Sequence, residues 1–295
     1  MTISNYKQPL QGRGISGLPY SIHAMNTTLV IMAGGRSTRM KKSAHQLGDH
    51  RLEAQVQGLH KSLIPLGKTK RPLMSRLCLE AFKAGVTEII VVTSPENEAF
   101  LDWRTSFEKN ESASAHLIHF APQVPDALSG KPLGTADAIF QAIQHYPKLK
   151  EQRFIIANGD NLYSATALGK AVHHSHSPHA LIAYEASALG FSEERISSFA
   201  LIKTDQNRRV EEIVEKPAVE KLDSFRDADG NLLVSMNLSV VEGGSFARAL
   251  EQCPIHPERK EKELPEAFRL ALKEEPSSVS VHLMHEKLPD LTSIT

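Results

Sequence analysis

Residues 28–40, TLVIMAGGRSTRM, join an apolar run to a glycine pair and then to a group of polar and basic side chains. Gly34 and Gly35 let the backbone turn tightly and present its N–H groups to an anion at close range. The side chains that follow supply charge and hydroxyl donors: Arg36, Ser37, Thr38 and Arg39. The stretch therefore predicts a phosphate-binding turn, although neither G-x-x-x-x-G-K-[ST] nor G-x-G-x-x-G is present. A tight turn with surface arginines is the structural alternative.

A second apolar run, RFIIANGD (153–160), ends in Asp160. A carboxylate at the end of a buried strand is costly to desolvate unless it meets a cation. Magnesium favours one or two carboxylates together with phosphate oxygens. The sequence therefore predicts that Asp160 holds Mg²⁺, with capping of the next helix as the alternative.

An ordered set of blocks resembles the sugar-1-phosphate nucleotidyltransferases, the NDP-sugar pyrophosphorylases. The blocks are LVIMAGGRSTRM (29–40), KSLIPLGKTKRPLMSRL (61–77), LGTADAIFQAI (133–143), FIIANGDNLYS (154–164) and VEEIVEKP (210–217). The resemblance implies transfer of a nucleotidyl group from an NTP to a sugar 1-phosphate, giving an NDP-sugar and pyrophosphate with the help of Mg²⁺. Such a reaction joins two polyanions, so it needs cations and backbone donors rather than a nucleophilic side chain.

On the nucleotide side, the resemblance implies that Arg39 holds the leaving pyrophosphate and that Lys61 stabilises the transition state. A guanidinium suits the first role because it can hold two phosphate oxygens at once. The insert 41–60 makes the spacing between these residues longer than is usual in the family. Other lysines near the turn are therefore alternatives to Lys61: Lys41, Lys42 and Lys68.

A nucleotide-binding set is expected on two of the blocks, 29–40 and 133–143, together with one residue outside them. Its members are Ala33, Gly34, Gly35, Ser37, Thr38, Gln123, Gly134 and Thr135. Gln123 is expected to read a base edge. Thr135 is expected to act as the N-cap of a helix whose positive end faces the nucleotide.

On the sugar side, the resemblance implies that Glu215 accepts hydrogen bonds from sugar hydroxyls and that Lys216 binds the sugar phosphate. Asn237 is expected to contact the sugar as well. Ala200 stands where the family usually has a glycine close to the sugar, so its methyl group is expected to change which sugar fits. Asp290 is the expected second metal ligand, although its segment lacks the glycine of the family's D-x-G-T.

Short apolar runs rich in valine and isoleucine predict buried parallel strands at 28–33, 88–94, 115–120, 153–160 and 179–186. Helical spacing of apolar residues between them predicts helices at 71–86, 134–146 and 164–176. Strands that alternate with helices predict an α/β fold with a doubly wound, Rossmann-like sheet. Because ligands of such sheets bind beyond the carboxyl ends of the strands, these elements would gather the motifs at one edge.

Beyond residue 186 the pattern changes. Two strands around a polar turn are predicted within 198–217, a strand at 232–243, a helix at 262–275 and a last strand at 277–288. We expect them to add antiparallel strands to a mostly parallel mixed sheet. Residues 27–295 are thus predicted to form a single domain with a nucleotide-binding half (27–186) and a sugar-phosphate-binding half (187–295), and 1–26 to form an N-terminal extension.

Composition limits the partners. The chain has 295 residues with 34 Lys+Arg and 34 Asp+Glu, so nothing in the net charge points to nucleic acid or an anionic membrane. Its two cysteines, Cys78 and Cys253, predict a reducing, cytoplasmic setting, and no apolar run approaches the ~18 residues of a membrane span. The oligomeric state stays open, with a homo-oligomer as one option.

The histidine-rich tract HHSHSPH (173–179) raises the alternative of a zinc site, but it is interpreted as a solvated segment, because no cysteine is near and no ligand spacing recurs.

Two alternatives to the sugar nucleotidyltransferase hypothesis also remain. AGGRSTRM resembles molybdopterin guanylyltransferases and related cytidylyltransferases, which act on non-sugar acceptors. An inactive nucleotide-sugar-binding regulatory homologue is the other.

Overall fold

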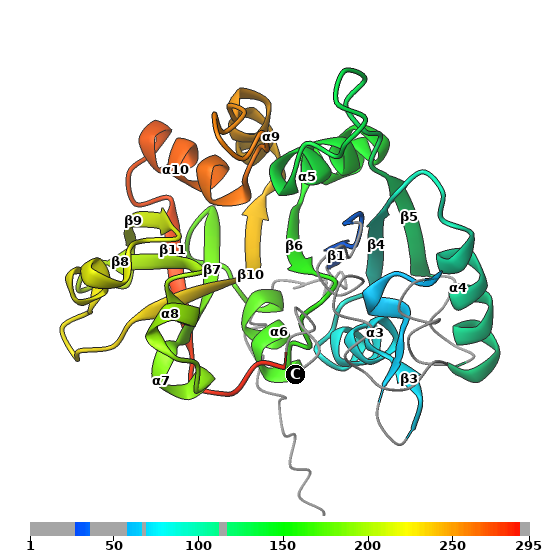
Figure 1. The fold of residues 1–295 in the computed structure, drawn as a ribbon, viewed down its shortest axis with the longest axis horizontal. Coiled ribbons are helices and arrows are strands. Elements are labelled where there is room, and N and C mark those ends of the chain that lie inside the picture. The colour runs from blue at the N-terminus through cyan, green and yellow to red at the C-terminus, as the bar shows by residue number, and fades with distance from the viewer. Residues whose placement is uncertain (1–26, 36–57, 67–68, 112–116, 290–295) are drawn as a thin grey trace, which may run out of the picture.

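A computed structural model gives the fold and describes residues 27–35, 58–66, 69–111 and 117–289. Its main sheet has nine strands in the order β11-β7-β10-β6-β1-β4-β5, with β8 joined to β10 and β9 joined to β8 (Figure 1). The strands of this sheet are β1 (Thr28–Met32), β4 (Glu88–Thr93), β5 (Ile118–Pro122), β6 (Arg153–Asn158), β7 (His179–Glu185), β8 (Ala200–Thr204), β9 (Val210–Glu215), β10 (Leu233–Glu242) and β11 (Val279–Met284). Several sequence predictions fall outside the described residues: the extension 1–26, Ser37, Thr38, Arg39 and Asp290.

The centre of the sheet is parallel, as predicted. β1 lies between β4 and β6, with Ile31 opposite both Val91 and Ala157. Alternate residues of β1 enter different cores: Leu29 and Ile31 pack on one face and Val30 on the other. Because both faces are covered, these strands are apolar throughout rather than alternating with polar residues.

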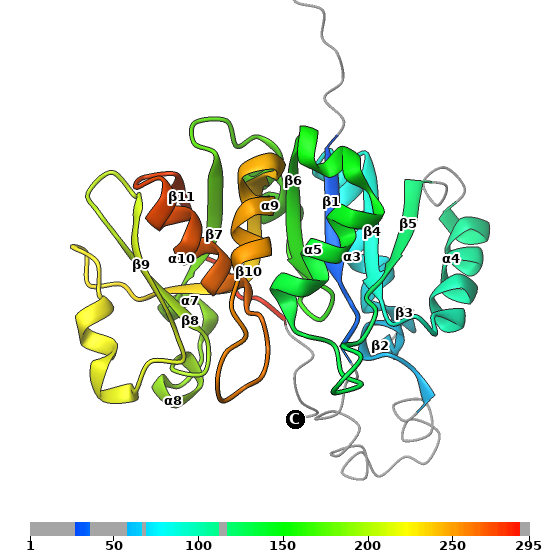
Figure 2. The same ribbon diagram turned by 90° about the horizontal axis from the view of Figure 1, so that it is seen from above.

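Helices cover both faces, which gives the doubly wound arrangement that the sequence predicted (Figures 1 and 2). One face carries α3 (Leu73–Lys83), α4 (Glu98–Glu111) and α6 (Ala165–Val172). The other carries α5 (Thr135–His145), α9 (Gly243–Gln252) and α10 (Leu264–Glu274). Shorter elements are α7 (Ala186–Leu189), α8 (Glu193–Ile196), the 3-10 turns η2 (Lys61–Leu63), η4 (Pro147–Glu151) and η5 (Val219–Phe225), and a small ladder of β2 (Pro65–Leu66) with β3 (Arg71–Pro72).

The C-terminal half does not simply extend one edge of the sheet. β10 inserts between β6 and β7 and runs antiparallel to both. β8 and β9 form the predicted antiparallel pair around the polar turn, and β8 attaches to the start of β10. β11 joins the edge parallel to β7, so this strand differs from the expected antiparallel additions. The class as a whole, a mostly parallel mixed sheet with antiparallel additions, is confirmed.

The sequence analysis did not predict α4 or α9. The start of α9 reads as a turn because of its glycine pair, Gly243 and Gly244, but the pair is a packing requirement. A Cβ atom at Gly243 would lie 1.7 Å from the carbonyl oxygen of Leu149, so only glycine fits there. The Glu242 carboxylate accepts hydrogen bonds from the N–H groups of Gly244 and Ser245 and caps the helix.

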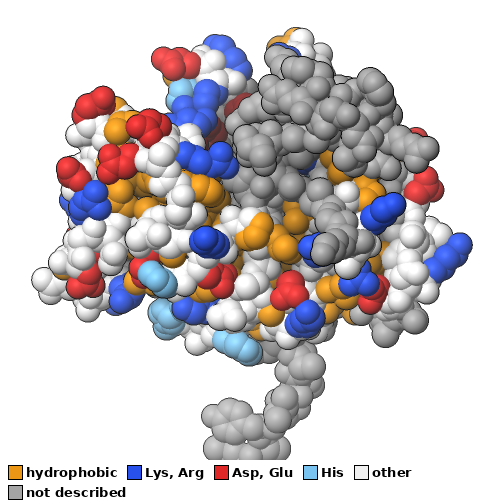
Figure 3. All heavy atoms as spheres, turned by 60° about the horizontal axis from the view of Figure 1, so that its bottom comes forward, with side chains coloured by type: hydrophobic (Ala, Val, Ile, Leu, Met, Phe, Trp, Pro, Cys, Tyr) orange, Lys and Arg blue, Asp and Glu red, His pale blue; other side chains and the backbone are white. Residues whose placement is uncertain are grey.

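The surface agrees with the balanced composition. Figure 3 shows basic and acidic side chains mixed on one face, with no large area of a single sign among the side chains drawn in colour. Across the described ranges, no helix combines the length and the apolar character that crossing a membrane requires.

Candidate active site

The phosphate-binding turn and the NGD segment lie next to each other at the carboxyl edge of the sheet. The N–H of Ala33 donates to the carbonyl of Val92, and the N–H of Gly159 donates to that of Met32 at 2.9 Å. A Cβ atom at Gly159 would come within 3.0 Å of the same Met32 oxygen, so glycine permits this close approach. Gly34 is similarly tight, since its Cβ would lie 3.0 Å from Oε1 of Gln123.

Asp160 and Lys61 form an ion pair at this edge. The Lys61 ammonium donates to Oδ2 of Asp160, and the two side chains are only 21% and 19% exposed. η2 places Lys61 there, and its N-cap His60 accepts a hydrogen bond from the N–H of Ser62 through Nδ1. The next helix, α6, is capped by Ser164 instead, so the alternative role of Asp160 as a helix cap is wrong.

The residues at this edge fit a magnesium ion. Asp160 is partly exposed at a strand end, and magnesium needs only one or two carboxylates when substrate phosphates complete its shell. The N–H of Leu162, in the turn after Asp160, donates to the carbonyl of Pro289 at 3.0 Å. Pro289 therefore lies next to the turn that follows Asp160, and it directly precedes Asp290 in the sequence.

Gln123 is a buried connector between the strand ends and α5. It is 4% exposed, and its Nε2 donates to the carbonyl of Gly134 at 3.1 Å and to Oδ2 of Asp137 at 2.8 Å. Gln141 donates to the same Asp137 oxygen at 2.9 Å. The amide donors of Gln123 are thus engaged within the protein, and its role in reading a base edge stays a prediction.

Thr135 does not cap its own helix, which corrects one expectation. The N-cap of α5 is Gly134, with φ of 101°, and it makes no side-chain capping hydrogen bond. The Thr135 hydroxyl instead accepts from the N–H of Leu264, the first residue of α10, at 2.9 Å. The N–H of Ala136, in the first turn of α5, has no acceptor within the helix and donates to the carbonyl of Lys262. The first turn of α5 is therefore hydrogen-bonded to the segment that begins α10.

The predicted sugar-phosphate residues gather on β8, β9 and β10. Ala200 lies opposite Glu215 on one side and Ser235 on the other, and it is buried at 4% exposure. Lys216 follows Glu215 with φ of 51°, and its ammonium lies 3.8 Å from the Glu215 carboxylate. Burial, and then the nearby Glu263 carboxylate, raises the pKa of Glu215 above its usual range.

Asn237 lies at an irregularity of β10. Its φ is 58°, and the register of β10 against β7 shifts between Ser235 and Ser239. Asparagine tolerates this left-handed conformation better than most residues, which explains its presence at the bulge. The side chain lines a small cavity with Ile213 and residues of α10.

Tyr163 and Asn161 join the NGD turn to β10, and the sequence analysis assigned neither a role. The Tyr163 hydroxyl donates to the carbonyl of Met236 at 2.6 Å, and Nδ2 of Asn161 donates to the same oxygen at 3.1 Å. Met236 directly precedes Asn237 in the sequence. These bonds therefore fix the distance between the turn that follows Asp160 and the bulge at Asn237. Both residues lie in the block FIIANGDNLYS, so their place next to Asp160 in that block could have indicated a structural role.

Arg259 was also missed, because it lies in the connection from α9 to α10, which carries no motif. Its guanidinium forms a two-pronged ion pair with Glu263, in which Nε donates to Oε1 at 2.5 Å. Its positive charge and that of Arg269 both act on Glu215. Arg259 is paired with Glu263, and Arg269 with Glu266. These side chains therefore surround Glu215 with ion pairs and add no net positive charge.

Known proteins resemble the chain in sequence and in fold. Glucose-1-phosphate adenylyltransferase from Mycoplasma mobile is 24% identical over 195 residues, which are 65% of this chain and 47% of that protein. The chain thus spans about half the length of this curated relative. A crystal structure of UDP-glucose pyrophosphorylase complexed with UDP-glucose superposes with a TM-score of 0.64 and 16% identity, over 90% of this chain and 92% of the other. At that identity the likeness concerns the fold.

The description of the matching family model is nucleotidyl transferase, and the match covers residues 28–286. This range contains every block on which the resemblance was based. As those blocks predicted, the chain belongs to the nucleotidyl transferase family.

Proposed function

We propose that this chain transfers a nucleotidyl group from an NTP to a sugar 1-phosphate, producing an NDP-sugar and pyrophosphate. The observation that carries the proposal is the arrangement along one sheet edge. The glycine turn and the Lys61–Asp160 pair lie at the ends of β1 and β6, while Glu215 and Lys216 lie at the end of β9. β10 connects the two groups, because its Met236 accepts from Tyr163 of the NGD turn and its first residues pair with β8.

On the nucleotide side, the N–H groups of the turn at Gly34 and Gly35 hold the triphosphate. Arg39 neutralises the leaving pyrophosphate, and Lys61 neutralises charge on the transferring phosphoryl group. Because the attacking sugar phosphate is already an anion, no side chain needs to remove a proton from it. The demand on the protein is to align the substrates and to stabilise charge.

Asp160, with Asp290 as the second ligand, would hold Mg²⁺ against the triphosphate. The bound ion supplies charge neutralisation between the phosphate oxygens. In the structure the Lys61 ammonium contacts Oδ2 of Asp160, so Mg²⁺ would take the other carboxylate oxygen or displace the lysine toward the substrate phosphates.

On the sugar side, Lys216 binds the sugar phosphate and Glu215 accepts hydrogen bonds from sugar hydroxyls. Asn237 adds an amide beside them. Ala200 is opposite Glu215 in the ladder, so its methyl group limits the space next to that carboxylate and contributes to sugar selection.

The test is a panel of nucleoside triphosphates and sugar 1-phosphates, assayed with Mg²⁺ for pyrophosphate release. We expect one matched pair to give release that depends on both substrates. Release with an alcohol or non-sugar phosphate, and with no sugar 1-phosphate, would favour the non-sugar transferase. Binding of NDP-sugars without release from any pair would favour the regulatory homologue.

The relatives narrow the first substrates to try. One is named for glucose 1-phosphate and adenylyl transfer, and the other was crystallised with UDP-glucose. ATP and UTP with glucose 1-phosphate are therefore the opening pairs of the panel. A cytoplasmic location and any homo-oligomer remain proposals that this assay does not address.

A further inference from the structure

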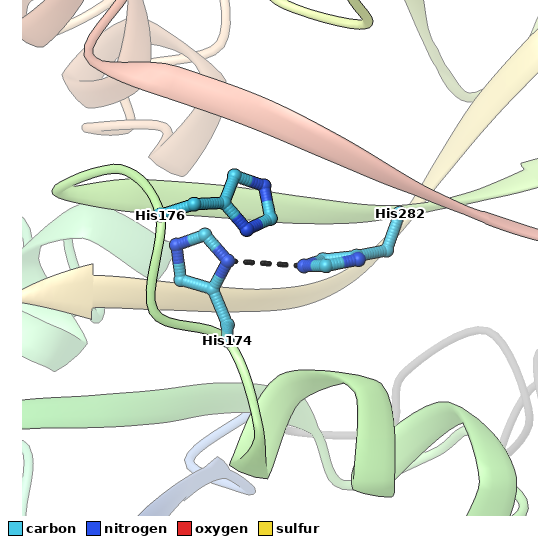
Figure 4. Close-up of side chains that lie close together, drawn as sticks. All are labelled: His174, His176 and His282. Carbon is cyan, nitrogen blue, oxygen red and sulfur yellow. Dashed lines mark hydrogen bonds between the residues drawn. The ribbon is translucent and has the colours of Figure 1, made fainter.

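Three histidines meet on the side of the sheet that carries α6. His174 and His176 come from the connection between α6 and β7, and His282 comes from β11, so the first and last are 108 positions apart in sequence. Their rings turn toward one another in Figure 4, and one possible ligand nitrogen from each lies within 4.8 Å of the others. His174 is buried, His282 is half-buried and His176 is exposed.

The cluster is distant from the proposed active site. His174 also lines a cavity of about 430 Å³ together with Thr27, Gln152 and Arg153. These three residues precede or begin β1 and β6, whereas Ala33 and Asp160 follow the same strands. The histidines therefore belong to the opposite part of the sheet from the nucleotide and sugar residues, and the proposed reaction does not use them. Figure 3 shows histidine side chains gathered on the lower part of one face.

The hydrogen bonds of His174 orient it as a metal ligand. Its Nε2 lies 2.9 Å from the carbonyl oxygen of Ser177, an acceptor that requires the proton to sit on Nε2. This leaves the lone pair of Nδ1 facing Nε2 of His282 at 3.0 Å. A metal-bound histidine characteristically donates its other ring N–H to such a carbonyl, which fixes both tautomer and ring orientation.

Two cationic side chains flank the cluster, Lys170 and Arg153. The flanking cations do not occupy the space between the rings. Lys170 donates to the carbonyl of Leu283 at 2.5 Å, and Arg153 donates to that of His174 at 3.4 Å.

We propose that His174, His176 and His282 bind a divalent transition-metal ion of the zinc class. Neutral imidazoles suit zinc, copper and nickel, while magnesium prefers oxygen ligands. Zinc–nitrogen bonds of about 2.0–2.1 Å place tetrahedral donors about 3.3 Å apart, close to the His174–His282 distance. His176 reaches the same position by a rotation of its exposed side chain. A fourth position is left for water, as in other three-histidine zinc sites.

The burial of His174 and His179 contradicts the interpretation of the HHSHSPH tract as a solvated segment. That tract supplies only two of the ligands, and the third comes from a strand near the other end of the described chain. A bound ion would fasten β11, which lies at an edge of the sheet, to the connection that precedes β7. We expect it to stabilise the fold without taking part in nucleotidyl transfer.

The experiment measures Zn²⁺ binding to the tag-free full chain by equilibrium dialysis against a competing chelator. We expect one tight zinc ion per chain, and His176→Ala should weaken it by at least about tenfold, since even outer-shell changes cost about this much. His176 is exposed, so this variant keeps its fold. His282→Asn is the second variant, with its fold checked by circular dichroism. His173→Ala is the matched control, because His173 is exposed in the same tract but is not part of the cluster.

Thermal unfolding provides an independent readout. At zinc concentrations about a hundredfold above the wild-type Kd, the melting temperature of the wild type should rise by roughly 5 °C, and that of His176→Ala by about half as much or less. Mg²⁺ at the same concentration should give the wild type and His176→Ala the same melting-temperature change, because magnesium does not bind to the three histidines. The proposal is overturned if wild type and His176→Ala bind zinc equally, if His173→Ala weakens binding as much as His176→Ala, or if no stoichiometric zinc is retained.

Discussion

Lys61 and Asp160 are 99 positions apart in sequence, yet the lysine ammonium donates directly to the aspartate carboxylate at the carboxyl edge of the sheet. The pair couples the loop before α3 to the end of β6. It places a cation and a potential magnesium ligand where the glycine turn ends β1. The proposed chemistry depends on this contact more than on any other single contact in the described residues.

Replacing either partner should therefore abolish most activity. We expect Lys61→Met and Asp160→Asn each to lower kcat for pyrophosphate release by roughly 100-fold or more, because a preorganised charge is lost from the reacting group or its metal. Lys148→Met is the control, since Lys148 forms a comparable pair with Glu88 outside the site. If Lys61→Met kept near-wild-type kcat, one of the alternative lysines would carry the role.

The raised pKa of Glu215 makes a prediction about stability and pH. Burial and the Glu263 carboxylate lift this pKa above its ordinary value near 4.5, so the native state holds the proton more tightly than the unfolded state. The free energy of unfolding should then fall as pH rises from that value through the raised pKa. Urea unfolding of Glu215→Gln should show a smaller fall over this window.

Glu212→Gln is the matched control for that experiment, because Glu212 is an exposed carboxylate on the same strand. Its unfolding should keep the pH dependence of the wild type. An equal loss of pH dependence in both variants would show that general surface charge, and not the burial of Glu215, causes the effect.

A pair of glycine substitutions should move stability in opposite directions. At Gly134, φ is 101° and an added Cβ would lie 2.6 Å from the carbonyl oxygen of Lys262. Gly134→Ala should therefore lower the free energy of unfolding by roughly 1–3 kcal/mol. Gly169 lies inside α6 with no atom within 4 Å of its Cβ position, so Gly169→Ala should raise it by up to about 1 kcal/mol. Chemical denaturation of both variants tests this contrast, and an equal effect of the two would contradict it.

Local patterns were sufficient to predict the central sheet, and long-range pairing was not. The apolar run at 28–33 is buried on both faces in any doubly wound sheet, so its composition alone indicates a parallel strand. No local feature of 233–242 says that this strand enters between β6 and β7, because that choice depends on which edges meet in space. The start of α9 shows another limit, since Gly243 reads as a turn until Leu149 is seen against it.

The same division applies to the candidate site. The NGD and glycine motifs are local patterns, so their residues could be named from the sequence, and the structure brings them together at the carboxyl edge of the sheet. Their roles in the reaction stay predictions. The prediction for Thr135 was wrong because a hydroxyl at the start of a helix usually caps that helix. Here the Thr135 hydroxyl accepts from the N–H of Leu264, which begins a helix far away in sequence. His282 carries no signal of its own, and only the parallel pairing of β11 with β7 brings it to the histidine tract.

Tyr163 supplies a final prediction, which separates positioning from chemistry. Its fully buried hydroxyl donates to the carbonyl of Met236 at 2.6 Å and accepts from the N–H of Asn158 and from Nδ2 of Asn161. Tyr163→Phe removes the hydroxyl from all three bonds, although Nδ2 of Asn161 still donates to the Met236 carbonyl. The free energy of unfolding should fall by roughly 1–3 kcal/mol.

The same change leaves Asn161 as the remaining hydrogen bond from the NGD turn to Met236 of β10 and so loosens this link. It should therefore reduce kcat for pyrophosphate release, while substrate binding at saturating Mg²⁺ changes less. Tyr146→Phe is the control, because the Tyr146 hydroxyl also donates to a backbone carbonyl, that of Phe120, but lies away from the turn. Urea unfolding and steady-state kinetics on both variants distinguish the outcomes. A Tyr163→Phe protein that is destabilised but keeps wild-type kcat would show that Asp160 is positioned by Lys61 and the strand end alone, without the link to β10.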